Sequence, residues 1–166
     1  MNKYGFIKDY INYYFKAKTK YSVHSPFIFE FITNVLKHKN YKTGQINDIE
    51  ILRKKLLTSK KEINVLDFGA GSETSQTKII SVNNIIKNSA KNKKYAALLY
   101  RIASYYKFKN ILELGTSAGI SSMYLASVSP EANITTIEGC PETSKLAEEN
   151  FKNLNYKNIK QITGKY

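Results

Sequence analysis

The spacing of apolar residues changes along the chain. In about the first hundred residues, apolar side chains recur every three or four positions, which is the spacing of one helix face. This spacing predicts a series of amphipathic helices. One of them is expected to begin at Ser25-Pro26. Another is expected at 76–87. The expected apolar faces are Ile7, Ile11 and Tyr14; Ile28, Phe31, Ile32, Val35 and Leu36; Ile49, Leu52 and Leu56; and Tyr95, Leu98, Leu99, Ile102 and Tyr106.

Short apolar runs bounded by polar or turn residues predict strands elsewhere. The clearest runs are at 110–114, 134–138 and 158–163, with a helix expected at 141–153. One earlier strand is expected near 63–68. Strands that alternate with helices are typical of the α/β fold class with a parallel sheet.

The strand at 110–114 leads into a glycine turn, from Gly115 to Gly119, and then into a predicted helix. Glycine has no side chain, so the backbone can turn sharply at these positions and approach a ligand closely. The N–H groups that open the next helix, at about 118–122, face an anionic or polar group. The turn therefore predicts a binding site.

Two acidic residues accompany this turn. Glu138 ends the next predicted strand, 23 residues after Gly115, close to the roughly 20-residue offset at which an acidic side chain binds ribose hydroxyls. Glu113 precedes the turn and is expected to accept a hydrogen bond from an ammonium group. A nicotinamide site more often shows G-x-G-x-x-G and does not call for this acid. S-adenosylmethionine is therefore the first candidate ligand, ahead of a dinucleotide.

The run ELGTSAGISSMYLA, with TTIEGCPETSKLAEENF behind it, resembles the first and second motifs of class I S-adenosylmethionine-dependent methyltransferases, closest to the O-methyltransferase branch. The resemblance covers about 91–166. It implies a Rossmann-like core whose first three strands are present, after a helical N-terminal region. Ser117 stands where such turns often have a middle glycine. The cofactor-binding candidates are Glu113, Gly115, Thr116, Ser117, Gly119, Ser121, Glu138, Gly139 and Cys140.

With this resemblance, the chain is expected to divide into two regions. Residues 1–90 would form a helical cap region with the short strand near 63–68, and residues 91–166 a partial Rossmann-like domain that binds S-adenosylmethionine. We expect an enzyme that transfers a methyl group to a small-molecule or other oxygen or nitrogen acceptor. We also expect a chain truncated after the third strand, a length at which activity can be lost. The edge of the strand at 110–114 would then be open to self-association, unless the strand near 63–68 fills it.

A second glycine motif, Asp67 to Ser72, competes with the first. VLDFGAG matches a generic first motif, but no Asp or Glu follows between Glu73 and Glu113, and no second strand is expected there. We therefore expect Asp67 to Ser72 to lie outside the cofactor site. Two interpretations stay open, a tight turn that caps the next helix or a loop that borders the acceptor pocket.

The charge of the chain supports a different class of function. The net charge is +13, with 26 basic and 13 acidic residues, which is typical of proteins that bind nucleic acid or anionic membranes. The alternative hypothesis is a non-catalytic basic protein that binds RNA or a protein partner and keeps a vestigial cofactor turn. Only Arg53 and Arg101 are arginines, so bidentate phosphate contacts are few.

Few residue types suited to other chemistry are present. With His24, His38 and Cys140 as the only histidines and cysteine, no metal site is expected. The catalytic residues stay unassigned, although His24 is the best base by side-chain type. A lone cysteine, no secretory signal and no membrane-length apolar run favour the cytoplasm.

Overall fold

The computed structural model describes residues 3–17, 22, 24–37, 43–67 and 76–164. The chain divides into two compact units, Met1–Lys39 and Asn40–Tyr166, and each is described by itself. This division by packing differs from the expected boundary at residue 90. That boundary concerns which part binds a cofactor, and it stays a prediction.

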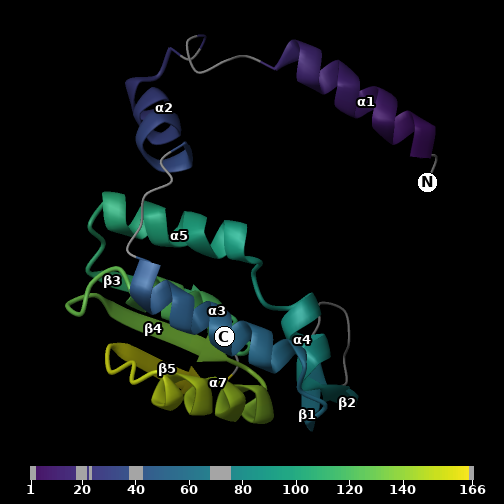
Figure 1. The fold of residues 1–166 in the computed structure, drawn as a ribbon, viewed down its shortest axis with the longest axis vertical. Coiled ribbons are helices and arrows are strands. Elements are labelled where there is room, and N and C mark those ends of the chain that lie inside the picture. The colour runs from purple at the N-terminus through teal and green to yellow at the C-terminus, as the bar shows by residue number, and fades with distance from the viewer. Residues whose placement is uncertain (1–2, 18–21, 23, 38–42, 68–75, 165–166) are drawn as a thin grey trace. The chain divides into compact units, whose positions relative to one another are not determined.

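The first unit is helical, as expected (Figure 1). It contains α1 (Lys3–Lys16), α2 (Pro26–Phe31) and the π-helix η2 (Ile32–Leu36). The predicted helix start at Ser25 is confirmed, because the Ser25 hydroxyl accepts a hydrogen bond from the Ile28 N–H at 3.4 Å. Proline follows directly, at a position where it costs the helix no hydrogen bond.

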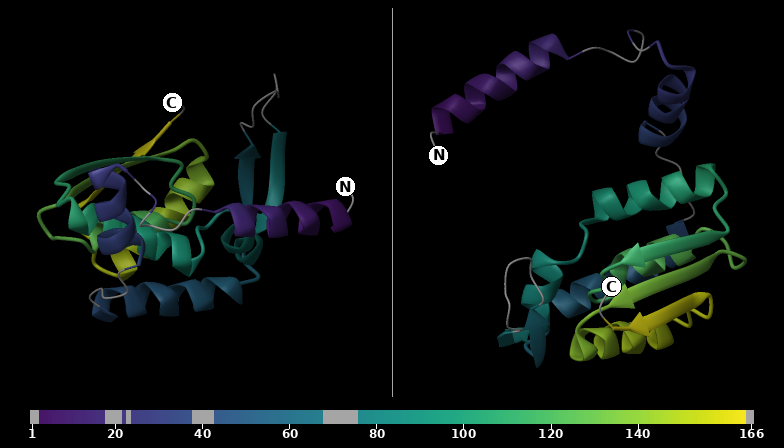
Figure 2. Two further views of the ribbon diagram at one scale, coloured as in Figure 1. Left: turned by 90° about the horizontal axis from the view of Figure 1, so that it is seen from above. Right: turned by 180° about the vertical axis from the view of Figure 1, so that it is seen from behind.

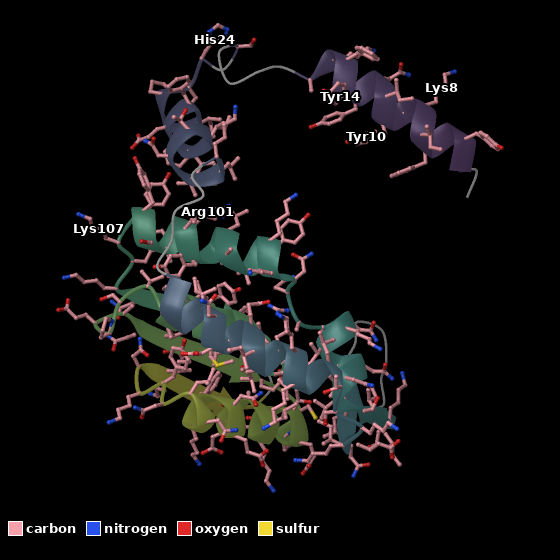
Figure 3. All side chains as sticks on the ribbon, viewed as in Figure 1. Lys8, Tyr10, Tyr14, His24, Arg101 and Lys107 are labelled. Carbon is pink, nitrogen blue, oxygen red and sulfur yellow. The ribbon has the colours of Figure 1, made fainter. Side chains whose placement is uncertain are left out.

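The predicted apolar faces of this unit are largely exposed. Val35 is buried, but Ile28 and Leu36 are exposed, so the expectation that they point inward is wrong within the described residues. On α1, the side chains of Tyr10 and Tyr14 project away from the helix (Figure 3) and are exposed. Helical spacing therefore identifies these helices correctly without identifying a core.

The second unit begins with α3 (Thr43–Leu57), whose predicted apolar face is confirmed. Ile46, Ile49, Leu52 and Leu56 are buried in the main core cluster. These positions recur at helical spacing, so their side chains form one apolar face that packs into the core.

Helix α5 (Lys93–Tyr105) turns a different face inward than its large residues suggest. The buried residues are Ala96, Ala97, Tyr100 and Ala103, while Tyr95 is exposed. Small side chains allow α5 to lie close to α6 (Ile120–Ala126), with which it is in contact. The predicted helix is therefore confirmed, and of the apolar residues that mark it Leu99 packs against the smaller core cluster while Tyr95 is exposed.

A hairpin occupies part of a segment predicted to be helical. Strand β1 (Glu62–Asp67) pairs antiparallel with β2 (Gln76–Ser81), and α4 (Val82–Asn88) follows. The predicted helix at 76–87 is thus wrong over its first half, and so is the expectation that no strand follows the Asp67 motif. Gln76–Ser81 contains β-branched residues, which favour a strand once a partner is available.

The remaining strands form the predicted parallel sheet. Its order is β3 (Asn110–Leu114), β4 (Asn133–Glu138), β5 (Ile159–Thr163). Helix α6 connects the first pair, and α7 (Pro141–Asn153) connects the second pair and has the predicted bounds. β1 pairs with β2 and not with β3, so the suggestion that β1 fills the slot beside β3 is wrong.

The helices cover one face of this sheet. Helices α6 and α7 contact β4 and β5, and α3 contacts α6 from outside. Seen from behind, the strands of the sheet are unobstructed by any described helix (Figure 2, right). On the side of the sheet that α6 and α7 leave free, Leu112 and Leu114 are 63% and 56% exposed. β3 also pairs on one edge only within the described residues, which confirms the expected open edge.

A buried polar cluster holds α3 against α6. The hydroxyl of the fully buried Tyr124 donates to Glu50 Oε1 at 2.8 Å, and Arg53 Nε donates to the same oxygen at 3.0 Å. Arg53 Nη1 also donates to the backbone carbonyl of Lys91 at 2.6 Å. The cluster therefore fixes the loop between α4 and α5 as well as the two helices.

Candidate functional site

The turn after β3 has the left-handed backbone that its glycines predict. Gly115 has φ of +88° and Gly119, the N-cap residue of α6, has φ of +78°. Ser117 also has a positive φ, of +52°. This conformation is costly for residues with a Cβ, which explains why glycine is common at that position in related turns.

Gly119 is required by a neighbouring side chain. A Cβ at this position would lie 2.3 Å from Cε1 of Phe151, whose ring belongs to α7. The close approach that the sequence predicts at Gly119 is therefore an approach to Phe151. The role of Gly119 in binding a cofactor stays a prediction.

The carboxylate of Glu138 is bound to the turn. One oxygen, Oε2, accepts a hydrogen bond from the Ser117 N–H at 2.8 Å, and Oε1 accepts one from the Cys140 N–H at 3.1 Å. The two parallel strands make this possible, because Ile137 pairs with Leu114 and their carboxyl ends meet. A carboxylate accepts about four hydrogen bonds, so Glu138 can still accept from ligand hydroxyls.

Glu113 faces the interior beside α6. Its Oε2 accepts hydrogen bonds from the Ser122 hydroxyl and, at 2.8 Å, from the Thr136 hydroxyl. Thr136 is in turn 2.7 Å from the hydroxyl of Thr116, which is 1% exposed. The protein therefore already supplies hydrogen bonds to Glu113 and Thr116.

A cavity of about 350 Å³ opens beside the turn and brings together distant parts of the second unit. Of the predicted residues, Gly115, Ser117, Glu138 and Cys140 line it. Glu113, Thr116, Gly119, Ser121 and Gly139 are not among its lining residues. The lining residues that sequence reasoning missed are Val65, Leu66, Ile80, Asn84, Ile85, Asn88, Ser89 and Thr143.

Cys140 joins the hairpin to this cavity. Its Sγ accepts a hydrogen bond from the Leu66 N–H at 3.3 Å and lies 3.6 Å from the Asn64 carbonyl, to which the thiol donates. Strand β1 is thereby held beside the end of β4. The strand that carries Asp67 thus borders the cavity, while residues 68–72 of the second glycine motif lie outside the described residues.

Two hydroxyl groups of the cavity lining are buried without a hydrogen-bond partner among the described residues. They are Ser117 Oγ and Thr143 Oγ1, and Thr143 is only 5% exposed. A buried hydroxyl without a partner costs about 1–3 kcal/mol, so such groups are usually satisfied by another protein group, water or a ligand. Both hydroxyls can therefore bind a polar ligand or water in the cavity.

Other kinds of site find no support in the described part of the chain. No group of three or more His, Cys, Asp or Glu residues there is arranged to hold a metal ion. His24 is exposed and belongs to the first unit, so its role as a base stays a prediction. None of the described helices combines the length and apolar character needed to cross a membrane.

Comparison with known proteins places these features in context. The chain is 33% identical over 69 residues to a protein-L-isoaspartate O-methyltransferase of Ignicoccus hospitalis, covering 41% of this chain and 33% of that one. It is 41% identical over 54 residues to a tRNA1(Val) (adenine(37)-N6)-methyltransferase of a Flavobacteriaceae bacterium, covering 32% and 23%. The chain thus spans a third or less of the curated relatives it matches, and no family model matches it.

Among solved structures, the chain is similar to a provisionally assigned caffeoyl-CoA O-methyltransferase from Staphylococcus aureus. The TM-score is 0.51 at 21% identity, over 82% of this chain and 50% of that one. The chain therefore has a Rossmann-like fold similar to that of this methyltransferase. The predicted resemblance to this class, O-methyltransferases included, is confirmed.

Proposed function

We propose that this chain binds S-adenosylmethionine in the cavity beside Glu138 and takes part in methyl transfer. The observation that carries the proposal is the Glu138 carboxylate, which accepts the Ser117 N–H and lines the same cavity as the turn. An acid at the end of the second strand, fixed to the glycine turn of the first, is suited to a ribose.

The residues of the site have separate tasks in this proposal. Glu138 accepts hydrogen bonds from the two ribose hydroxyls, and its bonds to Ser117 and Cys140 keep it in place. The turn at Gly115 approaches the methionine end, where no side chain stands between backbone and ligand. The sulfonium of the cofactor supplies the methyl group, and the chain contributes position and exclusion of water.

The acceptor is proposed only by class. The two curated relatives are named for transfer to an isoaspartate oxygen and to an adenine nitrogen. Both oxygen and nitrogen acceptors are thus compatible with this type of core. We propose an oxygen or nitrogen acceptor.

Calorimetric titration with S-adenosylhomocysteine tests the proposal. We expect micromolar binding by the unaltered chain and binding at least about tenfold weaker by Glu138→Gln, because a hydrogen bond to a charged group contributes about 1.5–3 kcal/mol. Glu131→Gln is the matched control. Glu131 is exposed and does not line the cavity, so its variant should bind like the unaltered chain.

Two results would contradict the proposal. One is a folded chain that does not bind S-adenosylhomocysteine, and the other is equal affinity in Glu138→Gln and Glu131→Gln. Retention of RNA that weakens steeply with salt, without cofactor binding, would instead support the non-catalytic basic protein of the alternative hypothesis.

A further inference from the structure

Helix α4 presents two primary amides to the cavity from outside the three-stranded sheet. Asn84 and Asn88 are four residues apart, so they lie on one face of the helix, and both line the cavity with Ser89. Both side chains are exposed, so a ligand can reach them. The amides therefore share one cavity with the Glu138 carboxylate.

We propose that Asn84 and Asn88 bind the adenine base of the cofactor whose ribose is held by Glu138. This inference rests on the proposed function. A primary amide carries a donor and an acceptor side by side, which matches the N6 amino group and N7 of adenine. The base is attached directly to the ribose, so it lies in the same cavity as Glu138.

The charge of the cavity lining supports a nucleoside over a phosphorylated nucleotide. The chain has 26 basic residues among 166, yet no Lys, Arg or His is among the described residues that line the cavity. Phosphate is usually bound by such side chains. Adenosine carries no phosphate and needs none of them.

Apolar and hydroxyl groups complete the match. Leu66 and Ile80 of the hairpin and Ile85 of α4 line the cavity and can cover the faces of a purine ring. The buried, unpartnered hydroxyls of Ser117 and Thr143 supply further donors for a polar ligand. Together these residues are suited to a planar, uncharged base.

The Cys140 thiol links the hairpin that precedes α4 to the end of β4, so that both border the same cavity. It holds β1 against the end of β4, and α4 follows directly from the strand that pairs with β1. The hairpin thus carries α4 to the cavity. The region before residue 90 is then part of the cofactor site rather than only a cap.

The test compares S-adenosylhomocysteine with S-inosylhomocysteine, in which an oxygen replaces the N6 amino group of adenine. The unaltered chain should bind the adenosyl compound at least about tenfold more tightly, which is the lower part of the range for a good amide–base pair. In the double variant Asn84→Ala and Asn88→Ala, the ratio of the two dissociation constants should fall below about threefold. A merely structural role would weaken both ligands equally and leave that ratio unchanged.

Asn133→Ala is the matched control, because Asn133 is an exposed asparagine at the start of β4 that does not line the cavity. Its ratio should equal that of the unaltered chain. Alanine favours helices, so the double variant should fold, which circular dichroism checks. An unchanged ratio in the double variant, or no preference in the unaltered chain, overturns the adenine assignment alone. Failure of both ligands to bind the folded, unaltered chain overturns the proposed function with it.

A second arm uses free adenosine and adenosine 5′-monophosphate as competitors of S-adenosylhomocysteine. A cavity wall without cations should bind adenosine more tightly than the monophosphate. Tighter binding of the monophosphate would contradict the assignment.

Discussion

Two strands of this molecule end in similar sequences but have different surroundings. β1 ends in Leu66-Asp67 and is followed in sequence by Phe68-Gly69, and β3 ends in Leu112-Glu113-Leu114 and is followed by Gly115. β3 pairs in parallel with β4, whereas β1 pairs antiparallel with β2 in a separate sheet. Figure 2 (left) shows this hairpin apart from the three-stranded sheet.

The difference shows that the next strand decides the chemistry of a glycine turn. A parallel partner requires a crossover and brings the carboxyl ends of both strands together. Glu138 reaches Ser117 for this reason. An antiparallel partner brings the start of β2 to the end of β1, and the register pairs Asp67 with Gln76. A motif that looks like a cofactor turn thus needs a parallel neighbour with an acid.

The largest expected effect comes from filling the close contact in the β3 turn. Gly119→Ala adds a Cβ against the Phe151 ring at a positive φ, and we expect it to lower the free energy of unfolding by about 2–5 kcal/mol. Gly44→Ala is the control, since no atom lies within 4 Å of its added Cβ, and it should change stability by less than about 1 kcal/mol. Urea denaturation measures both. Equal effects would show that the turn is not constrained by Phe151.

The next largest effect is expected at Glu113, the acidic residue of β3 whose side chain faces α6. Glu113→Gln removes the charged acceptor of the Ser122 and Thr136 hydroxyls and should destabilise the chain by about 1.5–3 kcal/mol. The corresponding change on the hairpin, Glu62→Gln, alters an exposed side chain and should stay within about 0.5 kcal/mol. The same denaturation midpoint in the two variants would contradict a stabilising role of the Glu113 carboxylate.

A smaller effect is expected at Cys140, where the hairpin contacts the end of β4. Cys140→Ala removes the acceptor of the Leu66 N–H, a loss of about 1 kcal/mol, and should speed hydrogen exchange at Leu66. Exchange of the amides in the middle of β4 should be unchanged. Unchanged exchange at Leu66 would mean that the hairpin does not depend on the thiol.

The smallest effect is confined to alkaline solution. Burial raises the pKa of Tyr156 above its usual 10.0, the hydrogen bond with Ser127 lowers it, and Asp48 raises it. The folded chain holds this proton more tightly than the unfolded chain, so the contribution to stability is complete below pH about 10 and falls as the pH rises further. Tyr156→Phe should therefore lose less stability than the unaltered chain between neutral pH and pH above 10. Identical pH profiles of urea denaturation would contradict this.

Much of the second unit follows from local sequence signals. Pro141 and the apolar spacing after it predict α7 with the bounds observed, and the apolar runs predict β3, β4 and β5. The β3 turn is equally local, since positive φ angles favour glycine. The position of Glu138 at the end of the strand after the turn follows from its distance of 23 residues from Gly115.

The missed features depend on contacts between distant residues. Gln76–Ser81 pairs with β1, and nothing within its own sequence shows that partner. Asn84 and Asn88 are ordinary polar residues on a short helix until the Cys140 thiol brings the hairpin to the end of β4. The fully interior position of Thr116 likewise depends on its contact with Thr136.

The central claim is that the cofactor binds at the β3 turn beside Glu138. Backbone amide chemical shifts of the isotope-labelled chain, followed during titration with S-adenosylhomocysteine, test it most directly. The Ser117 and Cys140 amides donate to the carboxylate that would receive the ribose, so they and Gly115 should shift most. Saturation without shifts at Ser117 and Cys140, or with the largest shifts in α1, would contradict the claim.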